Sequence, residues 1–390
     1  MKTAAIICEC NPLHAGHQYL IACARASGAD CVLCVMSGCF VQRGEAAIAE
    51  PYLRAEALLC GGADVVLELP FPFSAASAEF FARAGVEVAD RLGADELWFG
   101  SECGEIGLLS RLSQIAQSAE FAERYEKTVT ESRGTAQAYF ETLQALAGSD
   151  VPCSPNDILA LSYLRAIAER DSRLEPVTVK REGSAYLDET LVQGGFPSAT
   201  ALRKRWREGG VEAILPHLPQ ACAPVYARAE QPADLQYAER LILGFLRLTP
   251  VEAFENIAEL SGGLAAHLAQ AACRAKTLDE LWRLSATKKY PIARLRRGVL
   301  YALTGVTRED LHAPVGYARL LAANATGQTF LSLCRRTSEL SVVTRHTDLP
   351  NTEQAQRQEA LERRAYALYD LCFPSAGELP SPWRRAPVFL

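Results

Sequence analysis

The chain of 390 residues lacks any long apolar run. No uninterrupted apolar stretch approaches the roughly 20 residues that a membrane-spanning helix requires. The apolar start of the chain, residues 1–8, is too short for a secretory signal peptide and leads directly into polar residues. We therefore expect a soluble, cytoplasmic protein.

An excess of positive charge is also missing. The chain has 40 Lys and Arg against 46 Asp and Glu, for a formal net charge of −6. This negative net charge excludes a protein that binds nucleic acid through an overall positive charge. Any contact with nucleic acid must come from a local basic patch.

A disulfide or zinc framework is not indicated, although the chain has 13 cysteines. Their number is odd, the chain is large, and no export signal accompanies them. One CxxC occurs, with Cys31 and Cys34 inside an apolar run that predicts a strand, where positions i and i+3 point to opposite faces. No second CxxC supplies further zinc ligands. We expect the cysteines to be small core residues and predict no metal ligand among the protein side chains.

The first 180 residues alternate short strand patterns with helical ones. Strand patterns that are apolar on both faces, joined by helices, are typical of a parallel sheet covered on both sides. We predict an α/β fold with a doubly wound parallel sheet. Its expected strands are residues 3–8, 31–36, 64–69, 96–99 and 175–180, and its expected helices are 16–27, 51–59, 74–92 and 156–168.

The pattern changes after about residue 215. Ala, Leu, Arg and Glu dominate and β-branched runs become scarce, apart from a possible short strand at 342–344. Residues 108–147 also have a helical pattern. We predict two domains, an α/β domain over residues 1–212 and a mainly helical domain over 213–390.

The most informative motif follows the first expected strand. Residues 9–17 read ECNPLHAGH, with His14 and His17 on either side of Gly16. An isolated HxxH is more often a surface feature than a catalytic one. Ligands of open parallel sheets, however, bind at the carboxyl ends of the strands, beside the N-terminus of the next helix. We therefore predict that both imidazoles donate hydrogen bonds to a phosphate group under attack.

A second motif begins a later helix. Ser198, Thr200 and Arg203 lie in the sequence SATALR, which alone is more often an ordinary capped helix. The dipole of an exposed helix contributes only about 0.3–1 kcal/mol. Together with HxGH, this motif resembles the nucleotidylyltransferases, and the resemblance implies that Arg203 and an ATP-bound Mg²⁺ stabilise the leaving pyrophosphate together with the two hydroxyl groups.

Together the HxGH and SATALR motifs resemble those of the nucleotidylyltransferase superfamily. Further segments narrow the resemblance to the bacterial tRNA(Met) cytidine acetate ligase family, and the similarity covers nearly the whole chain. These segments are MSGCFVQRGE at 36–45, FGSE at 99–102, SPNDIL at 154–159, KREG at 180–183, TKKYPIARLRR at 287–297 and YARLL at 317–321.

The resemblance implies an ATP-dependent ligase that converts acetate into acetyl-adenylate. The acetyl group would then be transferred to N4 of the wobble cytidine of elongator tRNA(Met). His14, His17 and Arg203 would be catalytic, and Ser198 and Thr200 would help to bind ATP. The other ATP-binding residues implied by the resemblance are Ile7, Cys8, Glu9, Cys10, Asn11, Pro12, Leu13, His14, Ala15, Gly16, His17, Gln18, Tyr19, Leu20, Gly100, Asn156 and Arg181.

Three residues depart from the family pattern. Cys10 replaces an aromatic residue, Leu13 replaces Phe, and Cys39 replaces a polar residue. The resemblance identifies no general base.

A basic segment provides the expected contact with tRNA. Residues 271–300 contain eight basic residues against two acidic ones, together with the aromatic Trp282 and Tyr290. A plain solvated helix face would usually mix both signs of charge, so we favour binding to phosphate groups. The predicted tRNA-binding residues are Lys288, Lys289, Arg294, Arg296 and Arg297.

Two alternatives remain open from the sequence. A small-molecule nucleotidylyltransferase that makes a nucleotide-containing cofactor would share both motifs, but it would leave the basic helical part without a purpose. An RNA-binding protein that has lost catalysis would not need His14, His17 and Arg203.

Overall fold

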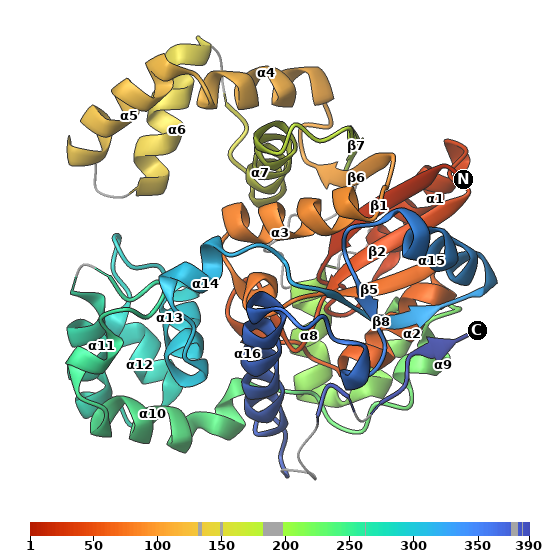
Figure 1. Ribbon diagram of the computed structural model, residues 1–390. Helices are drawn as coiled ribbons and strands as arrows, with labels where there is room; N and C mark the ends of the chain where they lie inside the picture. The colour runs from red at the N-terminus through yellow and green to blue at the C-terminus, as the bar shows by residue number, and fades with distance from the viewer. Residues whose placement is uncertain (132–134, 149–150, 182–197, 262, 376–380, 384) are drawn as a thin grey trace.

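The computed structural model describes residues 1–131, 135–148, 151–181, 198–261, 263–375, 381–383 and 385–390. Five parallel strands form the centre of one sheet, in the order β5-β2-β1-β6-β7 (Figure 1). Their bounds are β1 (Thr3–Cys8), β2 (Cys31–Ser37), β5 (Val65–Leu69), β6 (Glu96–Ser101) and β7 (Glu175–Lys180). The predicted doubly wound α/β fold is confirmed.

Helices cover both faces of this sheet. Alternate residues of β1 contribute to two different cores, which is why its sequence is apolar throughout. Cys31 and Cys34 of β2 likewise lie in different cores, as the strand geometry predicts. The core on one face includes residues of α1 (Ala15–Ala26), α2 (Pro51–Cys60), α8 (Ala199–Gly209) and α9 (Ala223–Tyr226), and the other includes residues of α3 (Ala78–Arg91), α7 (Pro155–Glu169) and α15 (Ala325–Thr337).

The helical stretch expected at 108–147 is three helices. They are α4 (Ile106–Ala116), α5 (Ala119–Glu131) and α6 (Thr135–Ala147). α4 packs on α7, while α5 and α6 pack on each other and extend away from the sheet (Figure 1). The ring of Phe121 contacts those of Tyr125 and Tyr139, with centroids 5.7 and 5.1 Å apart, and these aromatic contacts join the two helices.

The sheet also receives strands from far along the chain. β8 (Ala318–Ala323) pairs antiparallel with β5, and β9 (Val342–Val343) and β10 (Val388–Phe389) pair with β8. The predicted division at residues 212 and 213 therefore does not coincide with the edge of the sheet. The sequence of β8, ARLLAA, suits a helix as well as a strand. Its pairing with the edge of β5 joins residues about 250 positions apart, so the sequence pattern did not predict this strand.

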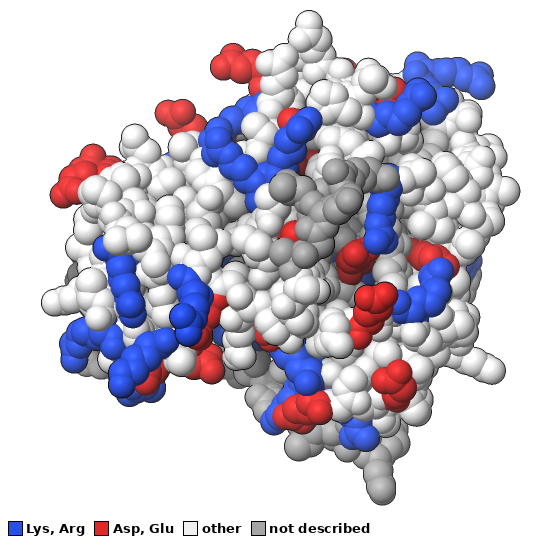
Figure 2. Space-filling view, turned by 90° about the horizontal axis from the view of Figure 1, so that it is seen from below, with Lys and Arg blue, Asp and Glu red and all other residues white. Residues whose placement is uncertain are grey.

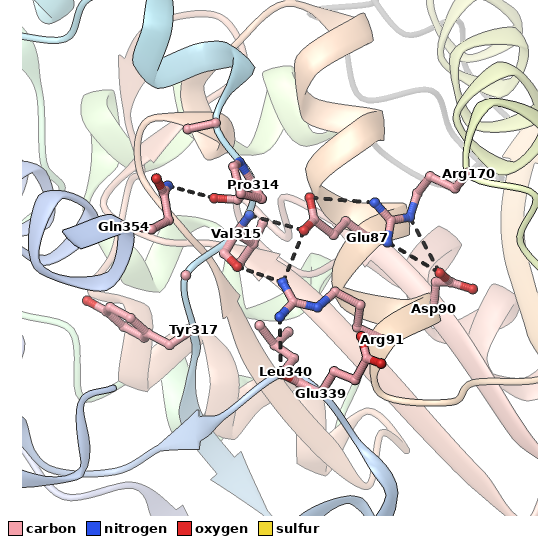
Figure 3. A network of polar contacts seen from close by, with 12 residues as sticks. Glu87, Asp90, Arg91, Arg170, Pro314, Val315, Tyr317, Glu339, Leu340 and Gln354 are labelled. Atoms are coloured by element: carbon pink, nitrogen blue, oxygen red, sulfur yellow. Dashed lines mark hydrogen bonds and ion pairs between the residues drawn. The ribbon is translucent and has the colours of Figure 1, made fainter. Parts of the chain in front are cut away.

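The connection that enters β8 is fastened to the end of α3 (Figure 3). Nη1 of Arg91 donates to the carbonyl oxygen of Val315 at 2.7 Å, and the backbone N–H of Val315 donates to Oε1 of Glu87 at 3.2 Å. Arg170, the C-cap of α7, has Nη2 3.4 Å from Oδ2 of Asp90. These charged contacts fix the direction in which the chain re-enters the sheet.

The remaining helices form a second cluster beside the sheet (Figure 1). They are α10 (Glu239–Leu248), α11 (Leu264–Arg274), α12 (Leu278–Ser285), α13 (Ile292–Thr304), α14 (Arg308–His312) and α16 (Glu353–Asp370). Their core includes Phe40 from a small hairpin of β3 (Phe40–Val41) and β4 (Glu45–Ala46) that follows β2. Within the described residues, no helix combines the length and apolar character that crossing a bilayer would need.

Candidate active site

The candidate site lies where the strand order of the sheet reverses. β1 has β2 on one side and β6 on the other, and all three strands are parallel. In open parallel sheets, this arrangement creates a crevice at the carboxyl ends of the strands, where ligands bind. The loop 9–14 leaves β1 at this edge, where Gly100 and Ser101 end β6.

Both histidines of the HxGH motif cap the first helix. His14 is the N-cap residue of α1, and its Nδ1 accepts the backbone N–H of Gly16 at 3.0 Å. Nδ1 of His17 accepts the backbone N–H of His14 at 3.3 Å, and the two ring centroids are 4.0 Å apart. Because Nδ1 is an acceptor in each ring, a neutral imidazole carries its proton on Nε2. Two Nε2–H donors are therefore available for a ligand.

Burial keeps both imidazoles uncharged at neutral pH. It lowers the pKa of His14 well below its usual value, and Arg181, Arg203 and His17 in its protonated form lower this pKa further. Burial also lowers the pKa of His17 to about 4, although Cys8 opposes the shift. Neutral donors at a helix N-terminus suit an anionic phosphate.

Helix α8 brings the second motif to the same loop. Ser198 is its N-cap, and the Ser198 hydroxyl accepts a backbone N–H of the first turn at 3.1 Å. Nη1 of the buried Arg203 donates to the carbonyl oxygen of Asn11 at 2.9 Å, and its Nη2 donates to Oγ1 of Thr200 at 3.2 Å. The structure thus brings Arg203 and Thr200 to the HxGH loop, as the motifs predict.

Distant elements fix the backbone of this loop. Nη1 of the fully buried Arg54 in α2 donates to the carbonyl oxygen of Glu9 at 2.8 Å. The hydroxyl of Tyr226 in α9 accepts the backbone N–H of Leu13 at 2.9 Å. Sequence analysis missed both Arg54 and Tyr226. The only signal for Arg54 in the sequence is that an arginine stands among the apolar residues of a helix that packs on the sheet.

The three residues that differ from the family pattern all have buried side chains. Cys10 and Leu13 are fully buried in the core between the sheet and helices α1, α2 and α8. Cys39 is buried in the core of the second helical cluster, and burial raises its thiol pKa well above the usual value. These replacements change packing around the loop without altering the charged groups of the site.

The end of β6 carries a further polar group. Nδ2 of Asn156 donates to Oε1 of Glu102 at 2.6 Å, and Nε of Arg181 lies 3.9 Å from the same oxygen. A Cβ atom at Gly100 would lie 3.1 Å from Cγ of Arg181, so the arginine crosses over this glycine. Gly100, Asn156 and Arg181 therefore lie together, as predicted. The remainder of the KREG motif belongs to residues 182–197, outside the described residues.

The hairpin of the QRGE motif connects the HxGH loop with α13. The backbone N–H of Gln42 donates to Oε1 of Glu9 at 2.9 Å. A Cβ atom at Gly44 would lie only 2.7 Å from the backbone nitrogen of Arg297. The absence of a side chain at Gly44 therefore permits close contact between the hairpin and the helix.

The basic residues of α13 have carboxylate partners within the chain. Arg296 forms an ion pair with Glu45 of the hairpin. Nε of Arg294 and Nε of Arg297 lie 3.3 and 2.7 Å from the carboxylate oxygens of Glu259. All three arginines were predicted to contact tRNA. In the structure, Arg296 holds the hairpin on α13, whereas Arg294 and Arg297 tie α13 to the segment before α11 that contains Glu259.

Lys288 and Lys289 differ from these arginines because both are exposed. Nζ of Lys289 lies 5.4 Å from the centre of the Tyr290 ring. Seen from below, basic side chains gather over the side of the second helical cluster, with acidic ones among them (Figure 2). Within the described residues, no group of three or more His, Cys, Asp or Glu side chains is arranged to hold a metal ion.

Comparisons with known proteins agree with this geometry. The model of the HIGH Nucleotidyl Transferase family matches residues 1–379. The tRNA(Met) cytidine acetate ligase of Syntrophotalea carbinolica is 35% identical over 360 residues, covering 88% of this chain and 85% of that protein. The Listeria monocytogenes protein of the same name is 34% identical, with 90% and 91% of the two chains covered.

Solved structures agree as well. The crystal structure of apo Thermotoga maritima TmcAL superposes over the full length of both chains with a TM-score of 0.93 and 29% identity. A second structure of that protein, bound with alpha-thio ATP, gives a TM-score of 0.90 and 28% identity, again over both full chains.

Proposed function

Because this chain belongs to the HIGH nucleotidyl transferase family, and within it to the tRNA(Met) cytidine acetate ligases, we propose that it joins acetate to elongator tRNA(Met) with ATP. The observation that carries this proposal is the convergence of His14, His17 and Arg203 on one loop at the carboxyl edge of β1. A small-molecule nucleotidylyltransferase would share that loop, but the relatives match over both halves of this chain.

In the first step, a carboxylate oxygen of acetate attacks the α-phosphorus of ATP and pyrophosphate leaves. The Nε2–H groups of His14 and His17 stabilise negative charge on the phosphates without transferring a proton. Arg203 stabilises the departing pyrophosphate, and Mg²⁺ bound to ATP would supply further positive charge there. Ser198 and Thr200, the loop from Ile7 to Leu20, and the group of Gly100, Asn156 and Arg181 complete the proposed ATP site.

In the second step, N4 of the wobble cytidine attacks the carbonyl carbon of acetyl-adenylate and AMP leaves. Adenylation is required because acetate itself offers only oxide as a leaving group. An anticodon-loop base is single-stranded and reaches a pocket at a modest unstacking cost. Residues 1–212 would carry the activation, and the second helical cluster would bind tRNA in the cytoplasm.

Mass spectrometry of nucleosides tests the proposal directly. Elongator tRNA(Met) incubated with the protein, ATP, Mg²⁺ and labelled acetate should contain labelled N4-acetylcytidine. His17→Ala should lower acetate-dependent pyrophosphate release by about 10²–10³-fold, since one preorganised donor is lost. Unlabelled tRNA after incubation with the unsubstituted protein would contradict the proposal.

A further inference from the structure

The HxGH loop contains a carboxylate that the two-step scheme has not yet used. Glu9 follows β1 directly, and its side chain turns toward the hairpin, where Oε1 accepts the backbone N–H of Gln42 at 2.9 Å. Its own carbonyl oxygen is held by Arg54 at 2.8 Å. Among the described residues, Oε2 of Glu9 accepts no hydrogen bond. One oxygen is therefore fixed and the other can accept a proton.

The surroundings of Glu9 combine charges of both signs. Arg203 of α8 and Arg43 of the hairpin act on it as cations, and Glu45 of β4 acts as a second anion. From α7, the phenol of Tyr163 lies within its electrostatic reach, with a pKa raised well above the usual value by burial, Cys8 and Glu9. His14 and His17 add no charge because both are neutral at pH 7.

We propose that Glu9 is the general base of acetyl transfer, an inference that rests on the proposed function. As N4 of cytidine forms its bond to the acetyl carbon, the bond from that carbon to the AMP oxygen breaks. The nitrogen then carries one proton too many, and Oε2 of Glu9 takes it, leaving N4-acetylcytidine, AMP and a protonated Glu9. Water accepts this proton before the next cycle.

Two features of Glu9 suit this chemistry. The hairpin amide holds Oε1, so the carboxylate is fixed in place on the loop that also carries His14 and His17. Burial raises the pKa of Glu9 above its ordinary value, although Arg203, the Gln42 amide and Arg43 oppose the shift. A carboxylate with a raised pKa is a stronger base.

The first half-reaction needs no base, because acetate attacks ATP as an anion. This difference separates catalysis by Glu9 from a purely structural contribution. Glu9→Gln keeps an oxygen that can accept the Gln42 N–H but removes the basic site. Glu9 also belongs to the proposed ATP site, so Glu9→Gln should lower acetate-dependent exchange of labelled pyrophosphate into ATP as well. We expect single-turnover acetyl transfer to tRNA, measured at saturating ATP and acetate, to fall by a further factor of about 10²–10⁴ beyond the loss of exchange.

The pH profile provides a second readout. Transfer by the unsubstituted enzyme should decline toward acidic pH as Glu9 becomes protonated, whereas Glu9→Gln should lack this decline. Glu9→Asp, which retains a carboxylate, should transfer more slowly yet keep the acidic decline, and Glu45→Gln should keep it as well.

Two outcomes would overturn the inference while leaving the proposed function intact. One is transfer by Glu9→Gln at the unsubstituted rate, and the other is a loss of exchange that equals the loss of transfer. If the unsubstituted enzyme exchanges pyrophosphate but transfers no acetyl group to tRNA, the proposed function fails, and the assignment of Glu9 fails with it.

Discussion

At the scale of single residues, the charge state of the two motif histidines has consequences for stability. Protonating both rings would create two positive charges at a ring separation of 4.0 Å, in a site that already contains Arg181 and Arg203. The folded protein therefore resists protonation at these positions. The unfolded chain has no such resistance, so the difference is linked to the free energy of unfolding.

The free energy of unfolding should fall as the pH drops from 6.5 toward 4. The unfolded chain takes up a proton at His17 with a pKa near 6.5, whereas the folded protein does so at about 4. Stabilisation from neutral His17 is thus complete above pH 6.5 and is lost through this window, by about 1.4 kcal/mol per pH unit. Urea unfolding of the unsubstituted protein and of His17→Gln, compared from pH 7 to 4.5, measures this slope. A constant difference between the two proteins over that range would contradict it.

Sequence alone predicted the residues whose partners lie nearby in the chain. His14, His17 and Ser198 cap the helices that they begin, and capping depends on local spacing. Arg54 and Tyr226 could not be predicted in the same way, because the loop that they support lies about 45 and 213 residues away. The hydrogen bond that fixes one oxygen of Glu9 comes from residue 42, 33 positions along the chain, so local spacing does not predict it.

At the scale of elements, the small hairpin is the contact between the HxGH loop and α13. Its β3 and β4 have two residues each, too few for an alternating pattern to be recognised in the sequence. Gly44 has φ +68°, and its Cα approaches the backbone of α13 closely. The turn therefore needs glycine for two reasons, its backbone conformation and the lack of space.

Gly44→Ala should destabilise the protein by more than its conformation alone explains. The new Cβ would meet the backbone of residues 297 and 296 at 2.7 and 2.8 Å, and backbone atoms of a helix do not move easily. Gly28→Ala is a matched control, because Gly28 has φ +91° and nothing within 4 Å of its Cβ position. We expect about 1 kcal/mol of lost stability for Gly28→Ala and at least about 3 kcal/mol for Gly44→Ala by urea unfolding. Equal losses would show that the hairpin does not press on α13.

The regular elements of the sheet were predictable because their patterns are strong. The strands at 3–8 and 175–180 match their predicted bounds, and the other three differ by one or two residues at one end. The helix predicted at 74–92 begins later, at Ala78, after a short turn of 3₁₀ helix over Phe73–Ala75. β8 was not predicted, since a short run of Ala and Leu does not distinguish a strand from a buried helix.

At the scale of the whole molecule, the basic residues of the second helical cluster serve two different purposes. Arg296 is paired with Glu45 and so helps to hold the second helical cluster against the hairpin beside the HxGH loop. Lys288 and Lys289 are exposed and precede α13, so their charges are available to phosphate groups. The overall charge of −6 makes such a local arrangement necessary for tRNA binding.

Substitutions should separate these two purposes. Replacing Lys288 and Lys289 by Ala should weaken tRNA binding and lower the salt dependence of log Kd by about one to two units, with stability unchanged. Arg296→Met should instead lower the free energy of unfolding by about 1–3 kcal/mol, since Glu45 loses its partner in a largely buried position. Filter binding at several salt concentrations and urea unfolding measure the two effects. A double lysine variant with the unsubstituted salt dependence would contradict the assignment.

The late return of the chain to the sheet affects how the protein can be made. β5 is complete once residue 69 has left the ribosome, but its neighbour β8 is not available until about 250 residues later. At a typical rate of about 5–20 residues per second, the hydrogen-bonding edge of β5 stays open for more than ten seconds of synthesis. An open strand edge invites pairing with other chains. A gene fragment that stops at residue 212 would keep this edge permanently, so it should aggregate where the full chain folds.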